Sequence, residues 1–137
     1  MTASPASTAN PARPAPVVIA AVVDFILILI FAAVGRDAHA RGDVVTGVFL
    51  TAWPFLVGLA AGWLAFRVWR RPFGVLAAGV PVWLCSLVAG MVLRLATGQT
   101  VVPAFVMVAL VSLGILLVGY RGLLALLARL TRRSART

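Results

Sequence analysis

The sequence is poor in charged residues and lacks lysine and glutamate altogether. Only 11% of its 137 residues are charged, and the three acidic residues are all aspartates. A soluble domain of this length needs roughly twice that share of charge to cover its surface. The shortage therefore excludes an ordinary soluble domain.

Cysteine and histidine occur once each, as Cys85 and His39. A single cysteine excludes a disulfide framework and a paired-thiol motif, and one histidine without further ligands is weak evidence for a metal site. No nucleophile–base pair and no nucleotide-binding motif is visible. We therefore expect a protein that is not an enzyme and uses no cofactor.

Apolar runs make up most of the chain, in which 63% of the residues are hydrophobic. Four runs are long enough to cross a bilayer as helices. The prediction is an all-α fold, a four-helix transmembrane bundle at residues 17–123, with helices at about 17–34, 44–66, 73–93 and 103–120. Residues 1–16 are predicted to be a disordered tail. Alternating leucines and arginines after residue 120 predict an amphipathic extension along the interface, and residues 124–137 a basic, flexible tail.

All twelve basic residues are arginines, and their distribution is uneven. If the N-terminus is cytoplasmic, nine lie on the inner side and three, Arg36, Arg41 and Arg94, on the outer side. This asymmetry predicts a bacterial inner-membrane protein with both termini in the cytoplasm. The expected partners are anionic lipid headgroups at the cytoplasmic face, and no nucleic acid. A signal peptide cleaved after residues 38–40 is disfavoured, because the apolar run is long and contains an acid.

Asp24 is the one carboxylate inside an apolar run, roughly 10 Å from the start of its helix. An ionised acid there costs about 2.5–3.5 kcal/mol, so it should face the bundle. Ser112 and Pro81 fall at a similar depth, where no arginine is expected, and Pro81 leaves the carbonyl of Ala77 free. We therefore expect a protonated, neutral Asp24 that joins helices through Ser112 or this carbonyl. The alternative is a proton or cation site.

Arg36, Arg67, Arg94 and Arg121 each follow one of the four predicted helices, where a cation complements the helix dipole. Arg36 and Arg94 share the outer face with His39, so these three form a candidate anion site. A solvated loop is the favoured interpretation of this cluster.

Aromatic and small residues divide between the membrane boundary and the helix contacts. Trp63 and Tyr120 fall near the cytoplasmic boundary and are typical of the interfacial belt. Gly58 and Gly62 have the spacing that lets two helix backbones approach closely, and Pro54 predicts a kink. The predicted packing and kink residues are Trp53, Pro54, Gly58, Gly62, Trp83 and Gly90.

Several segments resemble a bacterial and archaeal family of short four-pass membrane proteins, a domain of unknown function. They are residues 31–36 (FAAVGR) with His39, residues 51–55 (TAWPF) with 62–63 (GW), and residues 90–94 (GMVLR) with 97–99 (TGQ). The resemblance covers about residues 18–123. It implies that Asp24 stands where the family has an intramembrane acid, and Tyr120 stands where tryptophan is expected.

These patterns predict an uncharacterised integral membrane protein with a structural or accessory role. The alternative is a small proton-coupled carrier, oligomeric, with Asp24 as the titrating group. A water-filled cavity that reaches Asp24 would favour the carrier, and a dry, closed site would favour the structural role.

Overall fold

The computed structural model describes residues 14–37 and 43–135, and no strand occurs in these ranges. Four helices are long and apolar enough to cross a membrane: Pro14–Arg36, Val44–Ala65, Val75–Ala96 and Pro103–Ser134. The predicted four-helix, all-α membrane bundle is thereby confirmed. The fold thus follows from hydropathy, because a helix satisfies its backbone hydrogen bonds within its own segment in an apolar environment.

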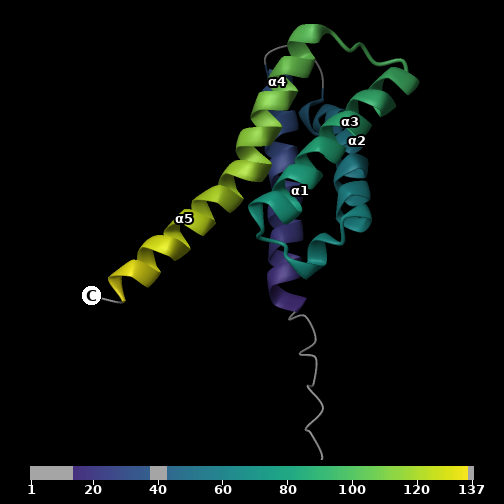
Figure 1. Cartoon of the computed structure of the whole chain (residues 1–137). Helices are drawn as coiled ribbons and strands as arrows, with labels where there is room; N and C mark the ends of the chain where they lie inside the picture. Colours follow the sequence, from purple (N-terminus) through teal and green to yellow (C-terminus); the bar gives the residue numbers. More distant parts are fainter. Residues whose placement is uncertain (1–13, 38–42, 136–137) are drawn as a thin grey trace, which may run out of the picture.

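The helices follow in chain order and pack as neighbours. They are α1 (Pro14–Asp37), α2 (Val44–Ala65), the 3₁₀ turn η1 (Val68–Arg70), the π-helical turn η2 (Val75–Gly79), α3 (Val80–Ala96), α4 (Pro103–Leu113), the π-helical turn η3 (Gly114–Val118) and α5 (Gly119–Ser134). Figure 1 shows α1 to α4 gathered in one bundle, and α5 extending away from it.

The helix bounds differ from the sequence prediction at both ends of the chain. α1 begins at Pro14, so residues 14–16 of the predicted tail are helical, while residues 1–13 lie outside the described ranges. The fourth helix does not stop at Tyr120, because α4, η3 and α5 follow one another without a break to Ser134. The segment after Tyr120 contains no proline and is rich in leucine, alanine and arginine, which are good helix formers.

The contact between α2 and α3 is close because glycines face the partner backbone. A Cβ atom at Gly58 would lie 2.6 Å from the carbonyl oxygen of Cys85, and one at Gly62 would lie 3.0 Å from the Cβ of Cys85. At Gly90 the space of a side chain is occupied by the ring of Phe55. The two helices therefore pack at a separation that a larger residue at these positions would not allow.

Aromatic side chains fill the end of the bundle near the α1–α2 connection. The ring of Phe31 from α1 lies edge-on to Phe55 from α2, with centroids 5.2 Å apart, and Phe105 from α4 lies 6.3 Å from Phe55. Trp83 is half-buried and its indole Nε1 donates to the carbonyl of Leu110 at 3.0 Å, which joins α3 to α4. Trp53 is half-buried and Pro54 is fully buried within α2.

Candidate functional site

Two buried charges face each other near the other end of the bundle. Asp24 comes from the first half of α1 and Arg121 from the first turn of α5, and both side chains are 0% exposed. Charged groups are rare in a membrane interior and normally pair with one another. The sequence therefore folds so that its one intramembrane acid meets an arginine from the far end of the chain.

The Asp24 carboxylate accepts a two-pronged contact from Arg121. Arg121 Nη1 lies 2.9 Å from Oδ1, and Nη2 lies 2.7 Å from Oδ2. This parallel pairing matches the planar fork of a guanidinium to the two oxygens of a carboxylate, which makes it stronger than a single hydrogen bond. Coulombic attraction inside an apolar bundle adds to it.

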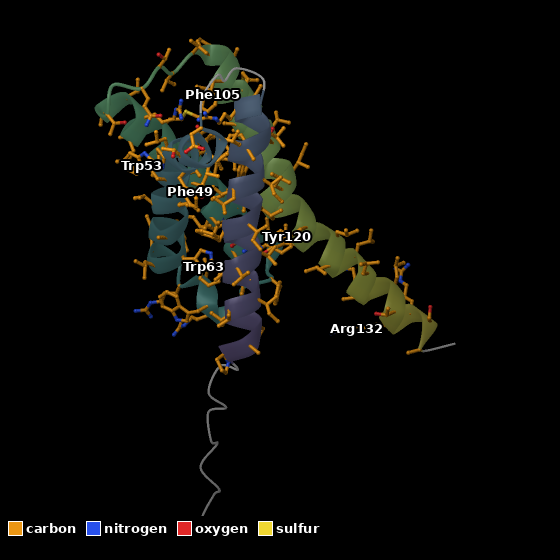
Figure 2. The ribbon with its side chains drawn as sticks, turned by 180° about the vertical axis from the view of Figure 1, so that it is seen from behind. Phe49, Trp53, Trp63, Phe105, Tyr120 and Arg132 are labelled. Atoms are coloured by element: carbon orange, nitrogen blue, oxygen red, sulfur yellow. The ribbon has the colours of Figure 1, made fainter. Side chains whose placement is uncertain are left out.

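Two aromatic side chains complete the surroundings of Asp24. Trp63 Nε1 from α2 donates to Oδ2 at 2.9 Å, and the Tyr120 hydroxyl donates to Oδ1 at 3.0 Å. Figure 2 shows Trp63 and Tyr120 on either side of α1. Each carboxylate oxygen therefore accepts two hydrogen bonds, which suits an ionised acid, since this form only accepts.

Arg121 also donates to backbone carbonyls, so the ion pair contacts a further segment besides the two helices that it joins. Its Nε donates to the carbonyl of Pro72 at 2.9 Å, and Nη1 donates to that of Leu117 at 2.8 Å. A Cβ at Gly79 would lie 3.1 Å from Arg121 Cδ, so this glycine leaves room for the arginine stem. Asp24, Trp63, Tyr120 and Arg121, which we call the clamp, join α1, α2 and α5 to the connection before α3.

The π-helical turn η3 ends at Val118, two residues before Tyr120, the first of the two clamp residues of α5. A π turn holds one more residue than an α turn, so it rotates everything after it by about 100° relative to a regular helix. We infer that this rotation sets the direction in which Tyr120 and Arg121 leave the helix. π turns inside α-helices are frequent at functional sites.

The structure corrects the predicted surroundings of Asp24. The expectation that no arginine lies at its depth is wrong, because Arg121 pairs with it directly. The predicted interhelical bond to Ser112 is also absent from the hydrogen bonds of Asp24 with described residues, which come from Arg121, Trp63 and Tyr120. Ser112 lines an apolar cavity instead. Pro81 is half-buried in the first turn of α3.

The difference comes from where the fourth helix ends. If it ended at Tyr120, Arg121 would be a cation just beyond it, at the membrane surface together with Tyr120 and Trp63. The helix in fact continues, and Arg121 is fully buried within it. The sequence does indicate that the helix can continue, because leucines recur at helical spacing past Arg121. It does not indicate that Arg121 turns toward Asp24.

The predicted outer cluster is partly assembled. Arg36 and Arg94 line one cavity, whereas His39 lies outside the described residues. Nearby, Asp43 precedes α2 and is exposed, and Thr46 Oγ1 donates to its carboxylate at 2.7 Å. This hydrogen bond is the main reason why the pKa of Asp43 is lowered from its ordinary value.

Metal coordination finds no support in the side-chain geometry of the described ranges. Within residues 14–36 and 43–135, no three His, Cys, Asp or Glu side chains come together in a way that could hold a metal ion. The carboxylate of Asp24 accepts hydrogen bonds from three protein side chains. The chemistry of this site is therefore that of a closed ion pair.

Four spanning helices tied by a buried ion pair define a helical integral membrane protein. The chain belongs to the family described as Protein of unknown function (DUF3054), whose model matches residues 21–124. All four clamp residues lie within the matched range, which ends early in α5. Searches of the curated proteins and of the solved structures each gave no match. The resemblance seen in the sequence is thereby confirmed.

Proposed function

We propose that this protein is a structural or accessory protein of a bacterial inner membrane, without enzymatic activity. The observation that supports this most directly is the closure of the Asp24 carboxylate, which is 0% exposed and accepts hydrogen bonds from Arg121, Trp63 and Tyr120. An acid that is held in this way stabilises a bundle and has no free position for a substrate. The clamp thus acts as a fixed joint between helices.

The proposal includes an orientation with both termini in the cytoplasm. It rests on the excess of arginines at one end of the bundle, where Arg67, Arg70 and Arg71 are all exposed. α5 carries leucines on one side and arginines on the other, so it fits an interface with anionic headgroups. Reporter fusions at each terminus test this orientation, and a periplasmic signal from the C-terminal fusion would contradict it.

A proton-coupled carrier with Asp24 as the titrating group is the competing function. It requires the carboxylate to leave its donors and take up a proton in each cycle. Proton uptake into vesicles that contain the reconstituted protein and a pH-sensitive dye tests this directly. We expect no uptake above that of empty vesicles, and an uptake that is lost in Asp24→Asn would favour the carrier instead.

A further inference from the structure

A positively charged cavity of about 670 Å³ lies at the end of the bundle away from the clamp. It is lined by Arg36 at the end of α1 and by Arg94 near the end of α3, with the hydroxyl-bearing Thr51 and Thr100. Phe105 also lines it and is labelled toward one end of the bundle in Figure 2. No acidic side chain of residues 14–36 and 43–135 is among its lining. The cavity is therefore suited to an anion.

The guanidinium of Arg94 has hydrogen-bond donors without an acceptor in the described part of the chain. Its Nε and Nη1 atoms are buried and have no hydrogen-bond partner there. Its central carbon lies 4.5 Å from the centroid of the Phe105 ring, which fixes the side chain at the cavity. Buried donors without acceptors are costly and rare. A phosphate oxygen is an acceptor that fits an arginine fork well.

Arg36 is held at the same cavity by the start of α2. Its Nη2 donates to the carbonyl of Asp43 at 2.9 Å, and its guanidinium occupies the space that a side chain at Gly47 would need. The carboxylate of Asp43 accepts from Thr46 at 2.7 Å. Arg36 is thus tethered through a backbone carbonyl. The carboxylate of Asp43 also attracts it electrostatically, but Asp43 is not among the residues that line the cavity.

An apolar groove continues from this cavity along the outside of the bundle. A second cavity of about 310 Å³ runs between α1 and α4 and shares with the first Phe31, Val34, Gly35 and Val108. Val34 is 70% exposed and Ile115 is 66% exposed, so the groove opens toward the surrounding lipid. On the fourth helix, the lining of the two joined cavities begins at Ala104 in the first and ends at Leu116 in the second. These two residues are separated by roughly 18 Å at the helical rise per residue, which is about one leaflet of a 30 Å hydrocarbon core.

We propose that the two joined cavities bind one anionic phospholipid. Its headgroup phosphate lies between Arg36 and Arg94, and one acyl chain lies in the groove between α1 and α4. Charge complementarity supports this occupant, because two arginines at the mouth of a groove of leaflet depth match a negative headgroup above an apolar tail. A zwitterionic lipid is a poorer match, since its cationic group meets the same two arginines.

Native mass spectrometry of the full-length protein, with phosphatidylglycerol or phosphatidylcholine added to the detergent, tests the proposal. We expect phosphatidylglycerol to be retained over phosphatidylcholine. Arg94→Gln should weaken that retention by roughly tenfold or more, because it removes hydrogen bonds to a charged group. Arg70→Gln is the matched control, since Arg70 is exposed in the connection between α2 and α3. It should retain the lipid as the unchanged protein does.

Two further variants keep the test decisive if Arg94→Gln fails to fold. Gly47→Ala should displace the guanidinium of Arg36 and lower retention, and Val108→Trp should block the groove without altering any charge. Unchanged retention in both variants would overturn the proposal. Equal retention of the two lipids would also overturn it, and so would displacement of phosphatidylglycerol by millimolar inorganic phosphate, which would identify a site for a free anion.

Discussion

Arg121 and Asp24 are separated by 97 residues in the sequence, yet their side chains form a two-pronged ion pair with N–O distances of 2.7 and 2.9 Å. Neither side chain is exposed. Because the pair joins the first helix to the last, it keeps these two helices from separating. This single long-range contact therefore links the first helix of the bundle to the last.

The aromatic donors of the clamp should contribute measurably to stability. Trp63→Phe and Tyr120→Phe each remove one hydrogen bond to Asp24 and retain the ring. We expect each to lower the free energy of unfolding by about 0.6–2 kcal/mol, the range for polar contacts between membrane helices. Unfolding by SDS titration in detergent micelles measures this. Trp69→Phe is the control, because this indole is 37% exposed, and an equal loss in the control would contradict the prediction.

Close packing of α2 on α3 predicts a position-dependent effect of adding a methyl group. Gly58→Ala should destabilise the bundle by about 1–3 kcal/mol, because its Cβ would lie 2.6 Å from the Cys85 carbonyl oxygen and force the helices apart. Gly122→Ala is the matched control in α5, since its Cβ would meet no atom within 4 Å beyond its chain neighbours and its own helix backbone. It should be neutral or stabilising. Equal destabilisation by both substitutions would show that the α2–α3 contact is not limiting.

Asp43 should show a pH dependence that requires Thr46. The Thr46 hydrogen bond lowers the pKa of Asp43, so this bond contributes stability above the ordinary pKa of aspartate. The contribution is lost as the pH falls through the lower folded-state pKa. In Thr46→Val the pKa of Asp43 should rise toward its ordinary value. Carboxyl chemical shifts recorded by NMR between neutral and acid pH measure this, and an unchanged titration of Asp43 in the variant would refute it.

The helices were predictable from the sequence, whereas the partners of Asp24 were not. Four long apolar runs predict spanning helices. An acid within the first run is costly to insert into a membrane, so the sequence also identifies Asp24 as a candidate site. The pairing of Arg121 with Asp24 is not predictable in this way, because the first charged residue after an apolar run is typical of the end of a helix. The π-helical turn Gly114–Val118 has no recognisable sequence signature, yet it precedes the two residues that reach Asp24.

At the end of the bundle that holds Arg36 and Arg94, the sequence likewise predicts some features and not others. The alternating topology places Arg36 and Arg94 on one face, so their proximity was foreseeable. The cavity between them was not, because it depends on how Phe105 packs beneath Arg94 and how Gly47 makes room for Arg36. Helix patterns specify which residues share an end of the bundle, but not what space the packed side chains leave.

The central claim is that the ion pair between Asp24 and Arg121 holds the bundle closed, and a double-mutant cycle tests it most directly. The free energy of unfolding is measured in micelles for Asp24→Asn, Arg121→Gln and the double variant. Each single variant leaves a buried group without its partner and should lose about 3–5 kcal/mol, whereas the double variant should lose clearly less than their sum. Strictly additive losses, or single variants that are as stable as the unchanged protein, would contradict the account.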